Sequence, residues 1–329
     1  MRVLITGAAG MLGRKLTARL VAHGRLQGRP IEAIDLVDLA PIEVGSTAAD
    51  PDRNDSGHPV LRSQVADLTV AGSADELARL GADVVFHLAG VVSGEAEADL
   101  AKGYRVNLDG TRALFDALAS SPGLPRVVFT SSIAVFGAPF PPVIPDDFHL
   151  TPLTSYGTQK AMGEALLADY SRRGLIDGVG IRLPTITVRP GRPNAAASGF
   201  FSGIIREPLN GEPALLPVPR TVRHPHASPR SAIGFMIHAA EIDTAHLGPR
   251  RNLTMPSISV SVEEQIAALV RMAGGEVVQW IRETPDETVA SIVAGWPEQF
   301  SADRARALGF VCEASYDEII QTYLDDDRS

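Results

Sequence analysis

Residues 2–13 read RVLITGAAGMLG, and this stretch decides the expected fold. The apolar run VLI is typical of a short buried strand, and a helical pattern of apolar residues follows over 14–23. In the turn between them, Gly7 allows a tight bend, Gly10 lets the backbone approach a pyrophosphate, and Gly13 permits close packing of helix on strand. A strand, a glycine-rich turn and a helix in this order predict a dinucleotide-binding site.

The next apolar stretch, at about 31–37, predicts a second strand. An acidic residue at the end of this strand accepts hydrogen bonds from the adenosine ribose and repels a 2′-phosphate. Asp38, which follows Val37, is the first choice, and Asp35 is the alternative. Because no arginine follows immediately, the sequence favours NAD over NADP.

Later apolar runs predict the rest of a parallel sheet. We expect strands at about 65–68, 83–90, 126–132 and 182–186. Helical patterns cover 104–118, the stretch that starts at 155, 262–272, and 301–324 with a break at Gly309, and a surface loop covers 45–59. Strands that alternate with helices indicate an α/β fold.

The stretch SYGTQK, residues 155–160, is the strongest candidate for catalysis. If it opens a helix, Tyr156 and Lys160 lie on one face, one turn apart. A lysine ammonium favours the phenolate and so lowers the pKa of the tyrosine from about 10. A tyrosine with a lowered pKa can exchange a proton near neutral pH. Lysine occurs at only two other positions of the chain, 15 and 102, which marks its use here.

Other polar residues stand where ligands bind in open α/β sheets, beyond the carboxyl ends of the strands. Ser132 ends a predicted strand and can hydrogen-bond a substrate oxygen. Ser93 lies in the loop that follows the strand at 83–90. Asn107, within a predicted helix, can organise the site, and Asp67 either contacts the adenine or caps a turn.

An arginine-rich stretch suggests an anionic ligand. Residues 182–230 hold seven arginines and two acids in a chain of net charge −9. A local excess of this size favours an anion as substrate. The pair His224 and His226 lacks a third ligand at a recognisable spacing, so we predict no metal site.

The composition is that of an ordinary globular protein, with 45% hydrophobic and 21% charged residues. Cys312 is the lone cysteine, which fits a reducing compartment, and we expect a cytoplasmic protein. The first residues are expected to form a strand rather than a signal peptide, and no apolar run is long enough to predict a membrane span. The negative net charge argues against nucleic acid as the main partner.

Taken together, these motifs resemble the extended short-chain dehydrogenase/reductase family, which includes NAD-dependent epimerases, dehydratases and dehydrogenases. The resemblance rests on the glycine turn, Asp67, LAG at 88–90, Asn107, TSS at 130–132 and Tyr156/Lys160, in the family's order over about 190 residues. It implies Tyr156 as acid/base, Lys160 on the nicotinamide ribose and Ser132 on the substrate oxygen. Where dehydratases of the family carry Thr-Asp-Glu, this chain has Ser132-Ile133-Ala134, which argues against dehydration.

The same resemblance implies the organisation of the chain. We expect a Rossmann-type doubly wound parallel sheet over 1–188, with return segments within 215–255, and a smaller interleaved substrate-binding domain mainly over 189–329. Family members often form dimers through two helices, here those that start near Tyr104 and Ser155. The implied cofactor-binding residues are Gly7, Gly10, Met11, Leu12, Gly13, Asp38, Asp67, Leu68, Leu88, Ala89, Gly90, Asn107, Tyr156, Lys160, Leu183 and Ile186.

Four further segments, 91–99, 154–160, 189–198 and 205–211, resemble the D-erythronate dehydrogenase subgroup of this family. The subgroup oxidises the 2-hydroxyl of a four-carbon aldonic acid with NAD. An acid substrate agrees with the arginine excess, and Ser93, Asn194, Arg206 and Arg230 are the candidates to hold it, beside Ser132 and Tyr156. The alternatives are a uronate or other sugar-acid dehydrogenase, a sugar-nucleotide 4-epimerase, or an NAD-sensing regulator without catalysis.

Overall fold

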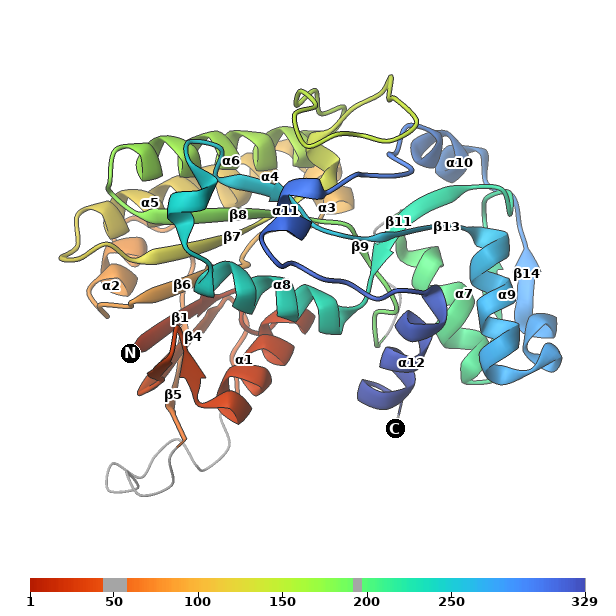
Figure 1. Cartoon of the computed structure of the whole chain (residues 1–329), viewed down its shortest axis with the longest axis horizontal. Helices are drawn as coiled ribbons and strands as arrows, with labels where there is room; N and C mark the ends of the chain where they lie inside the picture. Colours follow the sequence, from red (N-terminus) through yellow and green to blue (C-terminus); the bar gives the residue numbers. More distant parts are fainter. Residues whose placement is uncertain (44–57, 192–196, 329) are drawn as a thin grey trace.

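A seven-stranded parallel sheet forms the centre of the computed structural model, which describes residues 1–43, 58–191 and 197–328 (Figure 1). Its spatial order is β12-β8-β7-β6-β1-β4-β5. The strands are β1 (Arg2–Thr6), β4 (Ala33–Asp38), β5 (Val60–Val65), β6 (Val84–His87), β7 (Arg126–Ser132), β8 (Asp177–Leu183) and β12 (Asn252–Thr254). The strand order reverses between β1 and β6, which opens a crevice at the carboxyl ends of these strands. The predicted α/β fold with a doubly wound parallel sheet is thus confirmed.

Helices cover both faces of the sheet, which explains why its inner strands read as continuous apolar runs. In β1, Val3 and Ile5 pack into one core with α1 (Met11–His23) and α8 (Pro229–Glu241). Leu4 faces the opposite side, in a second core with α2 (Ser73–Ala78), α5 (Thr111–Ala119) and α6 (Ser155–Arg172). Shorter elements are β2 (Arg25–Leu26), β3 (Arg29–Pro30), α3 (Ser93–Ala98), α4 (Leu100–Tyr104) and turns of 3₁₀-helix at Ile133–Val135, Thr244–Leu247 and Gly275–Trp280.

A smaller body follows β8 and has its own core. It holds the three-stranded sheet of β9 (Thr185–Ile186), β11 (Arg223–Ala227) and β13 (Ile258–Ser261), and the pair β10 (Ala214–Leu216) and β14 (Ile281–Glu283). Its helices are α7 (Gly199–Leu209), α9 (Val262–Ala273), α10 (Glu287–Ala294) and α12 (Tyr316–Asp326). The chain returns to the central sheet through α8 and β12, and α11 (Asp303–Ala307) packs beside β12. None of the described helices has the length and apolarity needed to cross a membrane.

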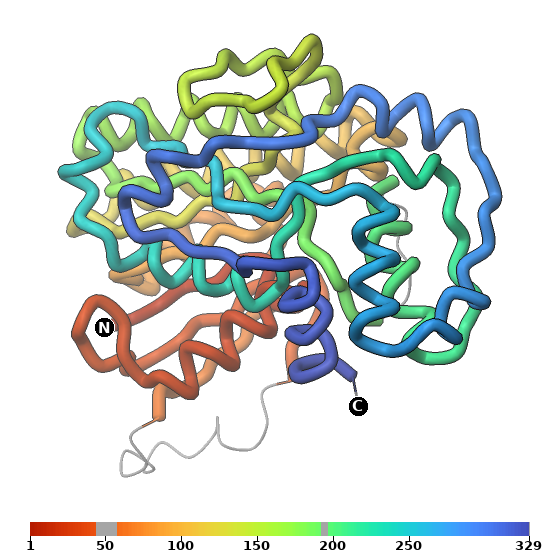
Figure 2. The backbone as a smooth tube through the Cα atoms, turned by 45° about the vertical axis from the view of Figure 1, so that its right-hand side comes forward, coloured from red at the N-terminus to blue at the C-terminus, as the bar shows by residue number. Residues whose placement is uncertain are grey.

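The C-terminal segment meets the first helix of the chain although the two are far apart in sequence. Figure 2 shows the C-terminal helix α12 beside α1, and the Lys15 ammonium lies 2.6 Å from the Asp327 carboxylate that follows α12. The last helix therefore ties the smaller body to the first helix of the sheet domain.

Several predicted elements need correction. The third strand is β5, which ends where the predicted strand at 65–68 begins, because an edge strand exposes most of its side chains and carries no apolar run. The sixth strand is β8, which ends before Pro184, since proline lacks the N–H that a ladder requires. The helix predicted at 104–118 is interrupted by a π-helical turn at Arg105–Gly110. The helix predicted over 301–324 consists of α11 and α12 with residues 308–315 between them, and most of the predicted loop at 45–59 lies outside the described residues.

Two glycines of the first turn are required by sterics. Gly7 has φ +76°, and a Cβ there would lie 2.7 Å from the Ala89 nitrogen. A Cβ on Gly13 would lie 2.4 Å from the Gly7 oxygen and 2.6 Å from the Ala8 Cα. Helix α1 can therefore start directly against β1 only with glycine at both positions.

A buried ion pair joins α6 to the sheet. The Arg182 guanidinium of β8 lies 2.7 Å from the Glu164 carboxylate of α6, and the two side chains are 10% and 2% exposed. The Ser131 hydroxyl of β7 donates to the same carboxylate at 2.6 Å. Two strands and a helix thus share one charged cluster.

We predict that Glu164→Gln lowers the free energy of unfolding by about 3 kcal/mol, because it leaves the Arg182 cation buried without its counterion. Asp169→Asn is the matched control on the same helix, since the Asp169–Arg172 pair is exposed and contributes less than about 0.5 kcal/mol. Urea unfolding of the two variants measures both values. Equal losses in the two variants would contradict the role assigned to the buried pair.

Candidate active site

The crevice at the carboxyl ends of the strands holds two adjoining cavities, of about 400 and 420 Å³. Both are lined by Gly7, Gly10, Leu88, Gly90 and Val91, so the glycine turn lies between them. Together they contain every predicted cofactor residue except Asn107. The crevice is thus an elongated site with two halves.

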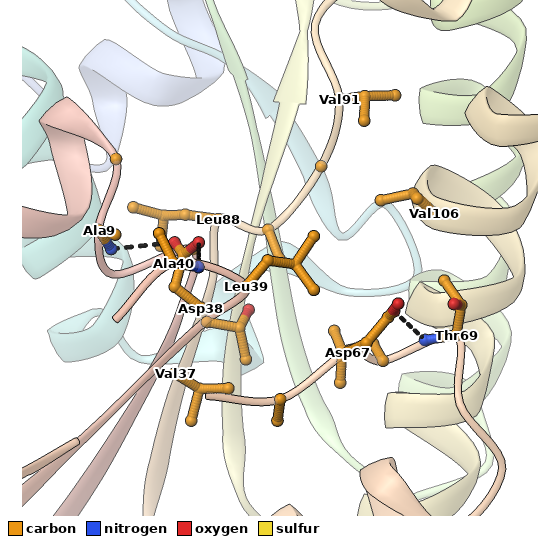
Figure 3. Close-up of a pocket in the computed structure, with 17 residues that line it drawn as sticks. Ala9, Val37, Asp38, Leu39, Ala40, Asp67, Thr69, Leu88, Val91 and Val106 are labelled. Carbon is orange, nitrogen blue, oxygen red and sulfur yellow. Dashed lines mark hydrogen bonds between the residues drawn. The ribbon is translucent and has the colours of Figure 1, made fainter. Parts of the chain in front are cut away.

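In the first half, Asp38 and Asp67 face the same cavity from two neighbouring strand ends (Figure 3). The Asp38 carboxylate accepts hydrogen bonds from the backbone N–H of Ala9 at 2.9 Å and of Ala40 at 3.2 Å. The Asp67 carboxylate accepts from the N–H of Thr69 at 2.8 Å, which is a turn cap.

Asp35, the alternative to Asp38, lies away from this cavity. Its carboxylate is buried between the guanidinium groups of Arg2 and Arg62, at 3.6 and 3.8 Å. Burial raises the pKa of the Asp35 carboxyl. The geometry therefore favours Asp38 for contact with a ligand.

The second half is formed where α6 meets the end of β7. The Thr154 hydroxyl accepts a hydrogen bond from the Gly157 N–H at 3.0 Å and caps α6. A Cβ on Gly157 would lie 2.1 Å from the Ala134 oxygen, so only glycine lets the first turn of α6 pack this closely on the segment after β7. This contact brings Tyr156 of α6 and Ser132 of β7 into one cavity lining.

Lys160 lies beneath the tyrosine, as the helical spacing predicts. Its buried ammonium donates to the Thr130 carbonyl at 2.9 Å. It lies 5.0 Å from the ring centre of Phe129 and 5.7 Å from that of Tyr156. Burial lowers the pKa of Lys160 to about 8.

The pKa of Tyr156 corrects one expectation from the sequence. Burial raises it to about 12, while the Ser132 hydroxyl and the Arg189 guanidinium act in the opposite direction. The cation with a stabilising effect on the phenolate is thus Arg189, and Lys160 is directed toward a backbone carbonyl instead. Desolvation of the phenolate outweighs these favourable contacts.

Asn107 lies behind the cavity lining, in the π-helical turn. Its side-chain oxygen accepts from the Val91 N–H at 2.9 Å, and its amide nitrogen donates to the Val91 carbonyl at 3.2 Å and to Gln159 at 2.7 Å. π-helical turns are frequent at functional sites. Asn107 therefore fixes the loop at Gly90–Val91. It lines neither cavity, and its direct role in catalysis or cofactor binding stays a prediction.

Three arginines of the arginine-rich stretch 182–230 lie in different environments. Arg189 lines the second cavity, and its guanidinium donates to the Ser198 hydroxyl at 3.0 Å. Arg206 is buried behind it and donates to the Arg189 carbonyl and to Glu207, both at 2.6 Å. Arg230 is half-exposed and pairs with Asp326 at 2.7 Å.

The predicted substrate residues are therefore only partly brought together. Ser93, Ser132 and Tyr156 line the second cavity. Arg206 and Arg230 do not belong to that lining, and Asn194 lies outside the described residues. Among the described arginines of 182–230, Arg189 is the one that lines this cavity, and the sequence offers no signal that singles it out.

The buried histidines serve as hydrogen-bonding core residues. His87 bonds Thr6 at 2.7 Å and Thr111 at 2.9 Å, and burial lowers its pKa to about 3. His224 and His226 bond the hydroxyls of Thr185 and Thr187. Within 1–43, 58–191 and 197–328, no group of three or more His, Cys, Asp and Glu residues could hold a metal ion.

Comparison with known proteins adds evidence from whole chains. Residues 3–242 match the model of the NAD dependent epimerase/dehydratase family. The chain is 45% identical to a D-erythronate dehydrogenase of Cupriavidus necator, over 99% of this chain and 98% of that protein. It is 37% identical to a D-erythronate dehydrogenase of Haemophilus influenzae, over 99% of this chain and 100% of that protein.

A solved structure is also similar over almost the whole chain. It is described as a nucleoside-diphosphate-sugar epimerase from Agrobacterium tumefaciens, is 56% identical, and superposes with a TM-score of 0.94 over 99% of this chain and 94% of the other. The glycine turn, the Tyr156–Lys160 pair and the parallel sheet agree with the family match. The chain belongs to the NAD-dependent epimerase/dehydratase family.

Proposed function

We propose that this protein is an NAD-dependent dehydrogenase that oxidises the 2-hydroxyl of D-erythronate to 2-dehydro-D-erythronate. The observation that carries the proposal is the meeting of Tyr156, Ser132 and Arg189 in one cavity. An acid/base, a hydroxyl and a partly buried cation suit the oxidation of a hydroxy acid. The full-length similarity to two D-erythronate dehydrogenases supports this substrate.

The crevice fits NAD. Gly7 and Gly10 line both cavities and carry no side chain, so a pyrophosphate can approach the backbone at the start of α1. Asp38 and Asp67 line the half suited to the adenosine, and the Asp38 carboxylate disfavours the 2′-phosphate of NADP. Lys160, Leu183 and Ile186 line the half suited to the nicotinamide ribose and ring. NAD bound here supplies the acceptor for the hydride that leaves C2.

The chain's own residues handle the proton. Ser132 hydrogen-bonds the oxygen on C2, and Tyr156 as phenolate removes its proton. Because burial raises the pKa of Tyr156 to about 12, the phenolate is the minor form at neutral pH. The Arg189 charge raises that fraction by favouring the anion.

Arg189 also holds the substrate carboxylate in this proposal. Its partly buried guanidinium faces the cavity, where a charged hydrogen bond is stronger than in water. Arg206 supports it by donating to its backbone carbonyl, and Glu207 balances the Arg206 charge. C1 and C2 of the acid are directly bonded, so the carboxylate and the C2 hydroxyl lie close together. Arg189 can therefore act on both the carboxylate and Tyr156.

The wider organisation follows from the same reading. We assign cofactor binding to 1–188 with α8 and β12 as return segments, and substrate binding mainly to 189–329. We expect a homodimer through the helices near Tyr104 and Ser155, where Leu100 and Met162 are 57% and 42% exposed. The lone Cys312 fits the cytoplasm.

The second candidate function is a sugar-nucleotide epimerase, favoured by the description of the 56% identical structure. An epimerase returns the hydride to its substrate and accumulates no NADH. A uronate or other sugar-acid dehydrogenase would perform the same NAD-dependent oxidation on a different acid. A non-catalytic NAD sensor is disfavoured because Tyr156 and Lys160 are both in place.

Absorbance at 340 nm tests the proposal directly. We predict NADH formation from D-erythronate with NAD, and a lower kcat/KM with NADP because of Asp38. L-threonate, D-glycerate and glucuronate complete the panel. If glucuronate alone yields NADH, the proposed substrate changes from D-erythronate to glucuronate. If no acid yields NADH, the dehydrogenase assignment is contradicted.

Replacement of the acid/base is the second test. Tyr156→Phe should lower kcat by at least about a hundredfold while the Kd for NAD stays within about threefold. For the wild type, kcat/KM for oxidation should rise with pH, since the phenolate forms as pH approaches the tyrosine pKa. Retention of near-normal turnover by the phenylalanine variant would rule out Tyr156 as the base.

Arg189 and Arg230 form a matched pair for the carboxylate. Arg189→Met should raise KM for D-erythronate by about ten- to a hundredfold, the effect of losing a charged hydrogen bond. Arg230→Met should change KM less than about twofold, because its guanidinium pairs with Asp325 and Asp326. The reverse result would restore Arg230 as the substrate ligand.

A further inference from the structure

Two threonine–histidine pairs lie side by side where the chain leaves the central sheet. Strand β9 pairs with β11 in parallel, with Thr185 opposite His226. The Thr185 hydroxyl bonds Nε2 of His224 at 2.7 Å, and the Thr187 hydroxyl bonds Nδ1 of His226 at 3.0 Å. The two pairs have the same chemistry and differ in their surroundings.

Only the first pair reaches the active site. Thr185 lines the cavity that holds Tyr156, Ser132 and Arg189. Thr187 is fully buried, and the second nitrogen of its partner His226 is bonded to Gln265 at 3.1 Å. The Thr185 side chain is therefore the one that a ligand can meet.

The His224 ring is held in place by its neighbours. It stacks on Phe201 with 5.1 Å between ring centres and 1° between planes, and it lies 5.2 Å from Trp296. Burial lowers the pKa of His224 to about 3, so the imidazole is neutral at working pH. A fixed neutral ring holds the Thr185 hydroxyl in one orientation.

Two other hydroxyls of the lining donate to protein acceptors. The Thr130 hydroxyl donates to the His87 carbonyl at 3.0 Å, and that of Ser131 donates to Glu164 at 2.6 Å. The Thr185 hydroxyl keeps a free bonding capacity with either tautomer of His224. If Nε2–H donates, the threonine O–H is free, and if the threonine donates, its oxygen lone pairs are free. A substrate hydroxyl both donates and accepts, so it suits both cases.

We propose that Thr185 hydrogen-bonds a hydroxyl on C3 or C4 of the substrate, and that His224 is the residue that positions Thr185. The inference rests on the proposed function, in which Tyr156 and Ser132 take the oxygen on C2 and Arg189 takes the carboxylate. The hydroxyls on C3 and C4 then remain for other polar groups of the lining, among them Thr185 and Ser93. The pair thus selects a polyhydroxy acid over a simple 2-hydroxy acid.

The test compares kcat/KM for D-erythronate with that for D-2-hydroxybutanoate, which has the same chain length without hydroxyls on C3 and C4. We predict that Thr185→Val lowers the ratio of the two values about tenfold, as expected for one lost hydrogen bond. His224→Phe keeps the aromatic stack but loses the nitrogen, and it should lower the ratio to a similar degree. The double variant should be no worse than the stronger single variant.

Three controls separate positioning from general damage. Thr185→Ser keeps the hydroxyl and should restore most of the ratio. Thr187→Val removes the matched hydroxyl outside the cavity and should leave the ratio unchanged. The Kd for NAD should stay within about threefold of the wild type in each variant.

The outcomes distinguish this inference from the proposed function. A wild type that makes no NADH from D-erythronate contradicts the function, and the assignment of Thr185 to this substrate falls with it. A wild type that oxidises D-erythronate, with an unchanged ratio in Thr185→Val, contradicts the inference alone. An equal loss of ratio in Thr187→Val also contradicts it, because the effect then comes from the fold.

Discussion

The buried pair of Arg182 and Glu164 is the interaction on which the active site depends. Glu164 lies one turn beyond Lys160 on α6, and its carboxylate joins β7 through Ser131 and β8 through Arg182. Ser131 precedes Ser132, and Arg182 precedes Leu183, so each partner adjoins a residue of the cavity lining. The cluster fixes the helix that carries Tyr156 against the strand that carries Ser132. The Glu164 charge also raises the pKa of Lys160, which partly offsets the lowering of that pKa by burial.

The exit from β8 controls the other wall of the site. Pro184 ends the ladder of the central sheet, and the next residues form β9 of the smaller body. Thr185 and Arg189 follow within a few residues and face the same cavity. The residues proposed for substrate recognition thus lie at the junction of the two bodies, where the chain changes sheets, while the half proposed for the cofactor lies against the β1–α1 turn.

Patterns between near neighbours predicted much of the fold and about half of the site. The strand at Arg126–Ser132 followed from its apolar run, and the helix that starts at Ser155 was expected from the SYGTQK stretch. The edge strand β5 was not predicted from the sequence, because the exposed side chains of an edge strand form no apolar run. The arginine excess predicted an anionic ligand, and the resemblance singled out Arg206 and Arg230, neither of which lines the cavity. Neither a charge count nor a motif specifies which side chains turn inward.

The sequence by itself determined the glycine turn and the one-turn spacing of Tyr156 and Lys160, because both depend on residues within a few positions of each other. The tertiary structure decided which acid and which arginine face the crevice, and it alone joined Thr185 to His224, 39 residues apart. It also decided the protonation of Tyr156, since burial, rather than the neighbouring lysine, dominates its pKa. Desolvation and long-range contact depend on packing, which local sequence patterns do not specify.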